Sequence, residues 1–146
     1  MTIIIRIGIA LLFLAEFVVG AWNVISPETF YTNLPTVDLT PPFSEHYARD
    51  FGGTTLGTGL LLGIALVKPK AHFAIPALLA YSVFAIPHFF YHLNNMENAT
   101  VGQAILLTVG NAFVALLGIF LILLTIVRDR RAKRSADLPD PAPVSY

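Results

Sequence analysis

Four long apolar segments dominate the sequence and constrain what this chain can fold into. They cover residues 3–25, 46–67, 71–91 and 101–127. A helix that crosses a bilayer needs about 20 mostly apolar residues, and each of the segments is long enough. The sequence therefore predicts an all-α protein, a four-transmembrane-helix bundle. Residues 1–127 would form this membrane domain, and residues 128–146 would form a tail.

The composition excludes several other classes of protein. Of the 146 residues, 55% are hydrophobic and only 12% are charged, whereas a soluble domain carries about 25% charged residues. Nine basic residues balance nine acidic ones, so no nucleic-acid partner is expected. The absence of cysteine excludes disulfides, iron–sulfur clusters, thiolate zinc sites and covalently bound c-type haem. The lipid bilayer is the expected partner of such a chain.

The first apolar segment shares some features with a secretory signal peptide, because Arg6 precedes a long apolar run. However, Glu16 interrupts that run, and no clear small-residue cleavage site follows it. We therefore expect the segment to be retained as the first membrane helix.

The distribution of Lys and Arg predicts the orientation. The link between the second and third segments contains Lys68 and Lys70, and residues 128–134 contain five basic residues. The loops 26–45 and 93–100 contain no Lys or Arg. By the positive-inside rule, both termini are cytoplasmic and these two loops face outward. We expect the basic run to lie against anionic headgroups, and the Pro-rich end of the tail to be disordered.

The first outer loop carries the signature of a short helix. Ser26 is suited to the N-cap, Pro27 to the first helical position and Glu28 to the first turn. Pro35 would end this helix. The sequence therefore predicts a short interfacial helix between the first and second membrane spans.

The second apolar segment contains pairs of glycines four residues apart, which lets helix backbones approach closely in a membrane. These residues are Gly53, Gly57, Gly59 and Gly63. They could pack against other helices of the same chain. The alternative is a seam between copies of the chain in a homo-oligomer.

Each span contributes one strongly polar residue to the outward half of the membrane. These residues are Glu16, Asp50, His88 and Asn111. Polar groups at membrane depth are costly, and they usually face the interior of a bundle. With Arg49 and Tyr81, they are the predicted lining of a pocket that binds a ligand or carries protons.

Two pairs of ionisable residues have helical spacing, which suggests a metal site instead. His46 and Asp50 are four residues apart, as are His88 and His92, so each pair lies on one helix face. Such ligands suit a divalent metal such as Zn, Mn or Fe. A third interpretation is structural, since ion pairs such as Glu16–Arg49 or Asp50–His88 would fix the helix register without chemistry.

Two sequence blocks carry a resemblance to a known group. Pro41–Gly52 contains Glu-His-x-x-Arg-Asp, and Val83–Leu93 contains Pro-His-x-x-x-His. Over residues 3–127 the chain resembles small four-helix membrane proteins of actinobacteria, which are grouped with DoxX-like proteins. The resemblance implies a four-helix bundle in the plasma membrane, without a particular activity. DoxX-type proteins have been linked to respiratory or redox-stress complexes, and a chain without cysteine is not suited to a thiol-based role.

Three functions follow from these patterns. The first is a small ligand-binding or lipid-binding protein, or an accessory subunit of a larger membrane complex, with a polar cavity open to the outer face. The second is a metal-dependent membrane enzyme that uses the His46, Asp50, His88 and His92 cluster. The third is a transporter, which would need several copies because four spans without repeats do not form a pathway. The sequence does not decide whether the protein is an enzyme.

Overall fold

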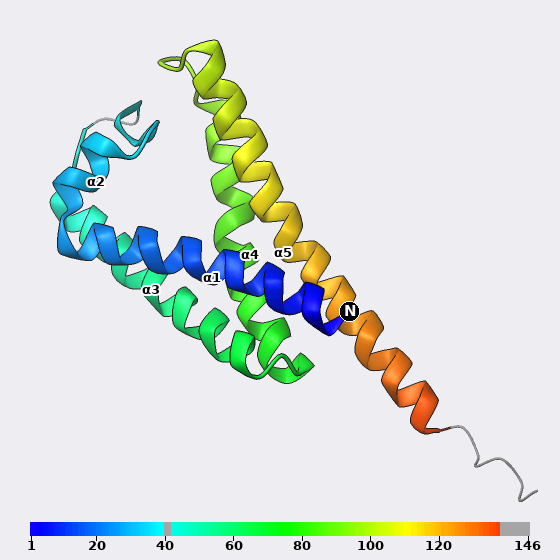
Figure 1. The fold of residues 1–146 in the computed structure, drawn as a ribbon. Coiled ribbons are helices and arrows are strands. Elements are labelled where there is room, and N and C mark those ends of the chain that lie inside the picture. The colour runs from blue at the N-terminus through cyan, green and yellow to red at the C-terminus, as the bar shows by residue number, and fades with distance from the viewer. Residues whose placement is uncertain (40–41, 138–146) are drawn as a thin grey trace, which may run out of the picture.

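The computed structural model describes residues 1–39 and 42–137, and the regular structure within them is helical (Figure 1). The elements are α1 (Thr2–Ile25), α2 (Pro27–Asn33), a short 3-10 helix η1 (Val37–Leu39), α3 (Glu45–Val67), α4 (Ala71–Asn94) and α5 (Val101–Ala136). Four of these helices, α1, α3, α4 and α5, are long and apolar enough to cross a membrane. The predicted all-α, four-span architecture is confirmed, and the chain is a multi-pass membrane protein.

The helices form two pairs. α1 packs along α3, and α4 packs along α5, with smaller contacts between the pairs (Figure 1). The pairs meet near the N-terminus of α1 and diverge toward the end of the bundle where α2 lies (Figure 1). The largest fully buried apolar side chains lie where the pairs meet: Ile5, Ile9, Leu12, Leu62, Leu78 and Leu121. The tightly packed apolar core therefore lies where the two helix pairs meet.

Two glycines allow α1 and α3 to approach closely at the diverging end. A Cβ atom on Gly52 would lie 2.7 Å from the Cβ of Asn23 and 2.8 Å from the carbonyl oxygen of Gly20. A Cβ atom on Gly20 would lie 2.9 Å from the carbonyl oxygen of Gly52. The carbonyl oxygens are backbone atoms and the Cβ of Asn23 is fixed to the backbone, so a larger residue at either glycine would fit only if the helices moved apart. Small residues thus bring the two helices together, as is usual in membranes.

The four predicted packing glycines divide into two groups. Side chains added at Gly59 and Gly63 would meet atoms of α1 at 3.5 and 3.1 Å. Side chains added at Gly53 and Gly57 would meet nothing within 4 Å. The prediction of packing within the chain therefore holds for Gly59 and Gly63 and is wrong for Gly53 and Gly57. A contact between copies through the open Gly53–Gly57 face stays a prediction.

The last helix is longer than the sequence predicted. The fourth span was expected to end at residue 127, but α5 continues through Ala136. The added residues are mostly Arg, Lys and Ala, which are good helix formers, and Lys133 and Arg134 in the last turn suit the negative end of the helix dipole. The first part of the predicted tail is thus helical. The Pro-rich end of the tail lies outside the described residues.

The short helix in the first loop is confirmed as α2, and it folds back onto the end of α1. The indole N–H of Trp22 donates to the hydroxyl of Thr29 at 2.8 Å, and the rings of Trp22 and Phe30 meet edge to face at 5.6 Å. Ser26 is the N-cap residue, but its side chain makes no capping hydrogen bond. Side-chain contacts with α1, together with Pro27 at the first helical position, hold the helix in place.

Unlike Ser26, Thr100 forms a full capping box at the start of α5. The Thr100 side chain accepts from the backbone N–H of Gln103, and the Gln103 side chain accepts from the backbone N–H of Thr100 at 2.9 Å. We expect Thr100→Ala to lower the free energy of unfolding by about 1 kcal/mol and to speed amide exchange in the first turn of α5. Ser26→Ala is the matched control and should change the unfolding free energy by less. Equal effects of the two substitutions would contradict this assignment.

Candidate functional site

A cavity of about 840 Å³ lies between the two helix pairs at their diverging end. Side chains of α1, α2, α3, α4 and α5 line it, together with residues of the connection between α2 and α3. Small-molecule sites typically enclose about 300–1,000 Å³ and are mainly apolar with a few polar groups. The cavity has the size and position of such a site.

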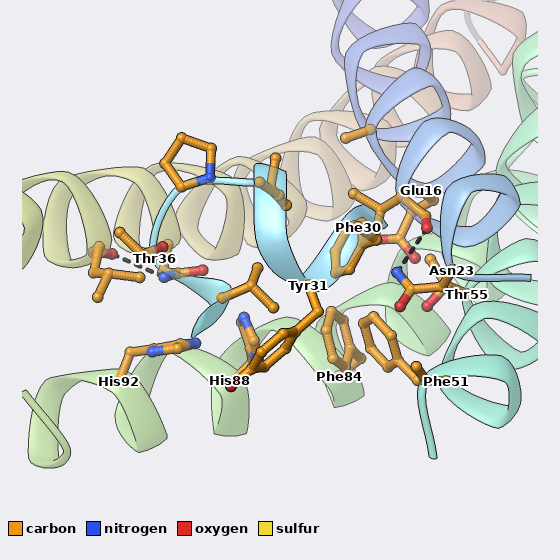
Figure 2. A pocket seen from close by; sticks show the side chains of 18 of the residues that line it. Glu16, Asn23, Phe30, Tyr31, Thr36, Phe51, Thr55, Phe84, His88 and His92 are labelled. Carbon is orange, nitrogen blue, oxygen red and sulfur yellow. Dashed lines mark hydrogen bonds between the residues drawn. The ribbon is translucent and has the colours of Figure 1, made fainter. Parts of the chain in front are cut away.

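One end of the cavity is polar and belongs to α1 and α3 (Figure 2). Glu16, Asn23 and Thr55 line it and are only 6%, 1% and 4% exposed. The Asn23 side-chain amide donates to the carbonyl oxygen of Val19 at 2.9 Å. Tyr81 of α4 lines the same cavity and is also buried.

Glu16 is the unusual member of this group. Its side chain lines the cavity, and among the described residues it forms neither a hydrogen bond nor an ion pair. No fully buried side-chain oxygen of the described residues lacks a hydrogen bond, so the unpartnered oxygens of Glu16 keep some accessible surface. A carboxyl group without a partner at membrane depth is nevertheless costly. A side chain kept in such a position points to a ligand that would supply the missing partner.

The middle of the cavity is aromatic. Phe30 and Tyr31 of α2, Phe51 of α3 and Phe84 of α4 lie between the two polar ends (Figure 2). The rings of Phe51 and Phe84 lie 5.6 Å apart and join the two helix pairs across the cavity. An apolar molecule would find ring faces and edges on several sides of this region.

The other end of the cavity is formed by α4 and the segment after α2. His88 and His92 lie here beside Thr36 (Figure 2), and their rings meet edge to face at 4.6 Å. Thr36 is buried and has a φ of 78°, which a β-branched residue rarely adopts. Strained backbone of this kind is concentrated at binding sites, where the surrounding structure holds it.

Four of the six residues predicted for the pocket line this one cavity. They are Glu16, Tyr81, His88 and Asn111. Asn111 comes from α5, and its side-chain amide donates to the carbonyl oxygen of Leu107 at 2.9 Å. These four residues come from α1, α4 and α5, so the structure brings together predicted polar groups of three of the four spans.

Arg49 and Asp50 do not line the cavity. Arg49 pairs with Glu45 at 2.8 Å and donates to the carbonyl oxygen of Val24, so it joins α3 to the end of α1. Asp50 lies 3.3 Å from His46, and both side chains are exposed. The predicted alternatives, a Glu16–Arg49 pair and an Asp50–His88 pair, are not formed.

The predicted metal ligands form two separate pairs. His46 and Asp50 lie on the exposed surface of α3, whereas His88 and His92 line the cavity from α4. Within residues 1–39 and 42–137, no group of three or more His, Asp or Glu side chains comes close enough to hold a metal ion. The structure therefore does not assemble the four predicted ligands.

At the Glu16 end of the cavity, sequence reasoning missed the polar residues Asn23 and Thr55. Asn23 follows Glu16 by seven residues, which is two helical turns, so the spacing could have placed both on one face. No such signal marked Thr55, because other threonines and glycines surround it. The aromatic wall was also missed, since Phe residues in a membrane helix are equally suited to facing lipid.

Comparisons of the chain with known protein families, with curated proteins and with solved structures find no match. The resemblance to DoxX-like proteins thus remains an expectation from the sequence.

Proposed function

We propose that this protein binds a small amphipathic molecule of the membrane in the cavity between its helix pairs. The observation that carries the proposal is an aromatic cavity of about 840 Å³ that contains a buried, unpartnered carboxyl group, that of Glu16. An apolar ligand body would contact the rings in the middle of the cavity. A polar group of the ligand would bind at one of the polar ends.

The apolar walls favour a ligand that partitions into the bilayer. Phe30, Phe51 and Phe84 come from three different helices and surround the same space. The ring surfaces that face the cavity have no atoms to contact on that side and so lack dispersion contacts. A hydrocarbon chain in the cavity would supply these contacts. The polar ends would fix the orientation of the ligand, as polar groups do in other small-molecule sites.

The site would belong to the outer half of the plasma membrane. The cavity is lined in part by α2, and α2 lies at the end of α1 away from the N-terminus (Figure 1). The basic residues of the 68–70 link and of 128–134 favour a cytoplasmic location for both termini. With this orientation the cavity would receive its ligand from the outer leaflet or from outside the cell.

The experiment uses a photoactivatable dodecanol that carries a diazirine on its chain. The purified full chain in lipid nanodiscs is irradiated with this probe, and the labelled peptides are identified by mass spectrometry. We expect labelling of residues that line the cavity, and we expect excess unlabelled dodecanol to compete with it. Labelling confined to the lipid-facing surfaces of the helices would contradict the proposed function.

A matched pair of substitutions separates binding in the cavity from partitioning into lipid. Asn111 and Asn94 each donate from the side chain to the carbonyl oxygen four residues earlier, at 2.9 and 2.7 Å, but only Asn111 lines the cavity. Asn111→Phe places a large ring in the cavity and should reduce its labelling about tenfold or more, the equivalent of about 1.4 kcal/mol. Asn94→Phe should leave the labelling unchanged. Similar labelling of both variants would contradict binding in this cavity.

A further inference from the structure

The charges around the cavity are unbalanced. Among the described residues that line it, Glu16 is the only Asp or Glu, none is Lys or Arg, and the two histidines, His88 and His92, lie at the opposite end (Figure 2). The nearby guanidinium of Arg49 is already engaged by Glu45 and by the carbonyl oxygen of Val24. The cavity thus presents an acceptor that no group of the described chain neutralises.

The neighbours of Glu16 also offer acceptors. One N–H of the Asn23 side-chain amide donates to the carbonyl oxygen of Val19, which leaves the second N–H to donate and the side-chain oxygen to accept. The Thr55 hydroxyl lies at the same end of the cavity and makes no hydrogen bond within the described residues (Figure 2). The Glu16 carboxyl and the Asn23 side-chain oxygen accept, and the Thr55 hydroxyl can accept or donate, so this end of the cavity can bind a ligand that donates several hydrogen bonds.

We propose that the ligand is a long-chain molecule with a hydrogen-bond-donating head, a protonated amine or a hydroxyl, which binds Glu16. The inference rests on the proposed function, because it names the chemistry of the ligand in the same cavity. A primary ammonium group carries three N–H donors and a positive charge, whereas a hydroxyl carries one donor and no charge. A long-chain carboxylate has no donor and repels an ionised Glu16. The cavity should therefore prefer amine to alcohol, and alcohol to acid.

The test compares three photoactivatable probes with the same dodecyl chain and diazirine, which end in an amine, a hydroxyl or a carboxylate. Each is applied to the full chain in nanodiscs of uncharged lipid, and labelling of cavity residues is quantified by mass spectrometry. Hydrogen bonds to charged groups contribute about 1.5–3 kcal/mol, so the amine should label the cavity at least about tenfold more strongly than the carboxylate. In the wild-type protein, unlabelled dodecylamine should also displace the alcohol probe.

Substitution of Glu16 tests whether this residue causes the preference of the cavity for the amine probe. Glu16→Gln keeps the size of the side chain and removes its charge, so it should abolish the difference between amine and alcohol labelling. Glu45→Gln is the control, because Glu45 is an exposed carboxylate paired with Arg49 outside the cavity. It should leave the preference for the amine unchanged.

The outcomes separate this inference from the proposed function. Equal labelling of the cavity by all three probes would overturn the inference and leave the proposed function in place. A preference for the amine that survives in Glu16→Gln would overturn the assignment to Glu16. If no probe labels the cavity, the proposed function itself fails. Because competition by dodecylamine is measured on the wild-type protein, the inference stays testable even if Glu16→Gln does not fold.

Discussion

Replacing Gly52 with alanine should lower the free energy of unfolding by about 1–3 kcal/mol, the usual cost of overpacking. The added methyl group would lie 2.7 Å from the Cβ of Asn23 and 2.8 Å from the carbonyl oxygen of Gly20. The carbonyl oxygen of Gly20 is a backbone atom of α1, and the Cβ of Asn23 is attached directly to that backbone. Rotation of a side chain therefore cannot relieve the contact. α1 and α3 would have to separate at the wall of the cavity. Reversible unfolding in mixed micelles of a mild detergent and sodium dodecyl sulfate measures the change.

The same helix provides the control for this prediction. Gly53 and Gly57 are exposed, and an added Cβ would meet nothing within 4 Å. Alanine is also the better helix former, by about 1 kcal/mol. Gly53→Ala and Gly57→Ala should therefore leave the protein as stable as the wild type or make it more stable. A destabilisation equal to that of Gly52→Ala would show that these glycines pack against something that the chain alone does not provide, such as a second copy.

Much of the fold could be predicted from the sequence, because a membrane span is recognised by its hydropathy averaged over about 20 residues and not by any single residue. Twenty apolar residues in succession leave few alternatives to a spanning helix. Ser26 and Pro27 marked the start of α2, although the Ser26 side chain turned out not to cap it. The end of α5 was harder to predict. Hydropathy marks where the apolar run ends, and a helix can continue past that point through good helix formers, as α5 does through Ala136.

For the site, the sequence predicts which residues are polar and at what depth of the membrane they lie, but no more. That was enough to bring together Glu16, Tyr81, His88 and Asn111, because a polar group in a span tends to face the interior of the bundle. The rotation of each helix about its axis depends on contacts that the sequence does not state. In α3 that rotation is determined by the close approach of Gly20 and Gly52, which turns Asp50 to the exposed surface.

Glu16→Met should raise the free energy of unfolding by about 1–3 kcal/mol when no ligand is present. Most substitutions of a buried residue destabilise a protein, but this one removes a carboxyl group that is 6% exposed and forms no hydrogen bond or ion pair among the described residues. Replacing even a buried ion pair with apolar side chains of similar size is often neutral or stabilising by about 1–4 kcal/mol, and a carboxyl group without a partner has no attraction to lose. Methionine matches the length of glutamate and adapts its shape to a gap. Unfolding in the same mixed micelles gives the sign of the change.

The controls for this prediction distinguish a ligand-binding role from a structural one. Glu45→Met removes a carboxylate that pairs with Arg49 at 2.8 Å, so it should be neutral or destabilising, as expected for an exposed pair. If Glu16 instead held the helices together, Glu16→Met would destabilise the protein. Added dodecylamine should stabilise the wild type and not the Glu16→Met variant, because only a ligand bound to the folded state shifts the equilibrium. Without ligand, the Glu16→Met variant should be more stable than the wild type. With dodecylamine, the wild type should gain stability and the difference should shrink or disappear. This result would mean that the chain keeps Glu16 for binding, at a cost in stability.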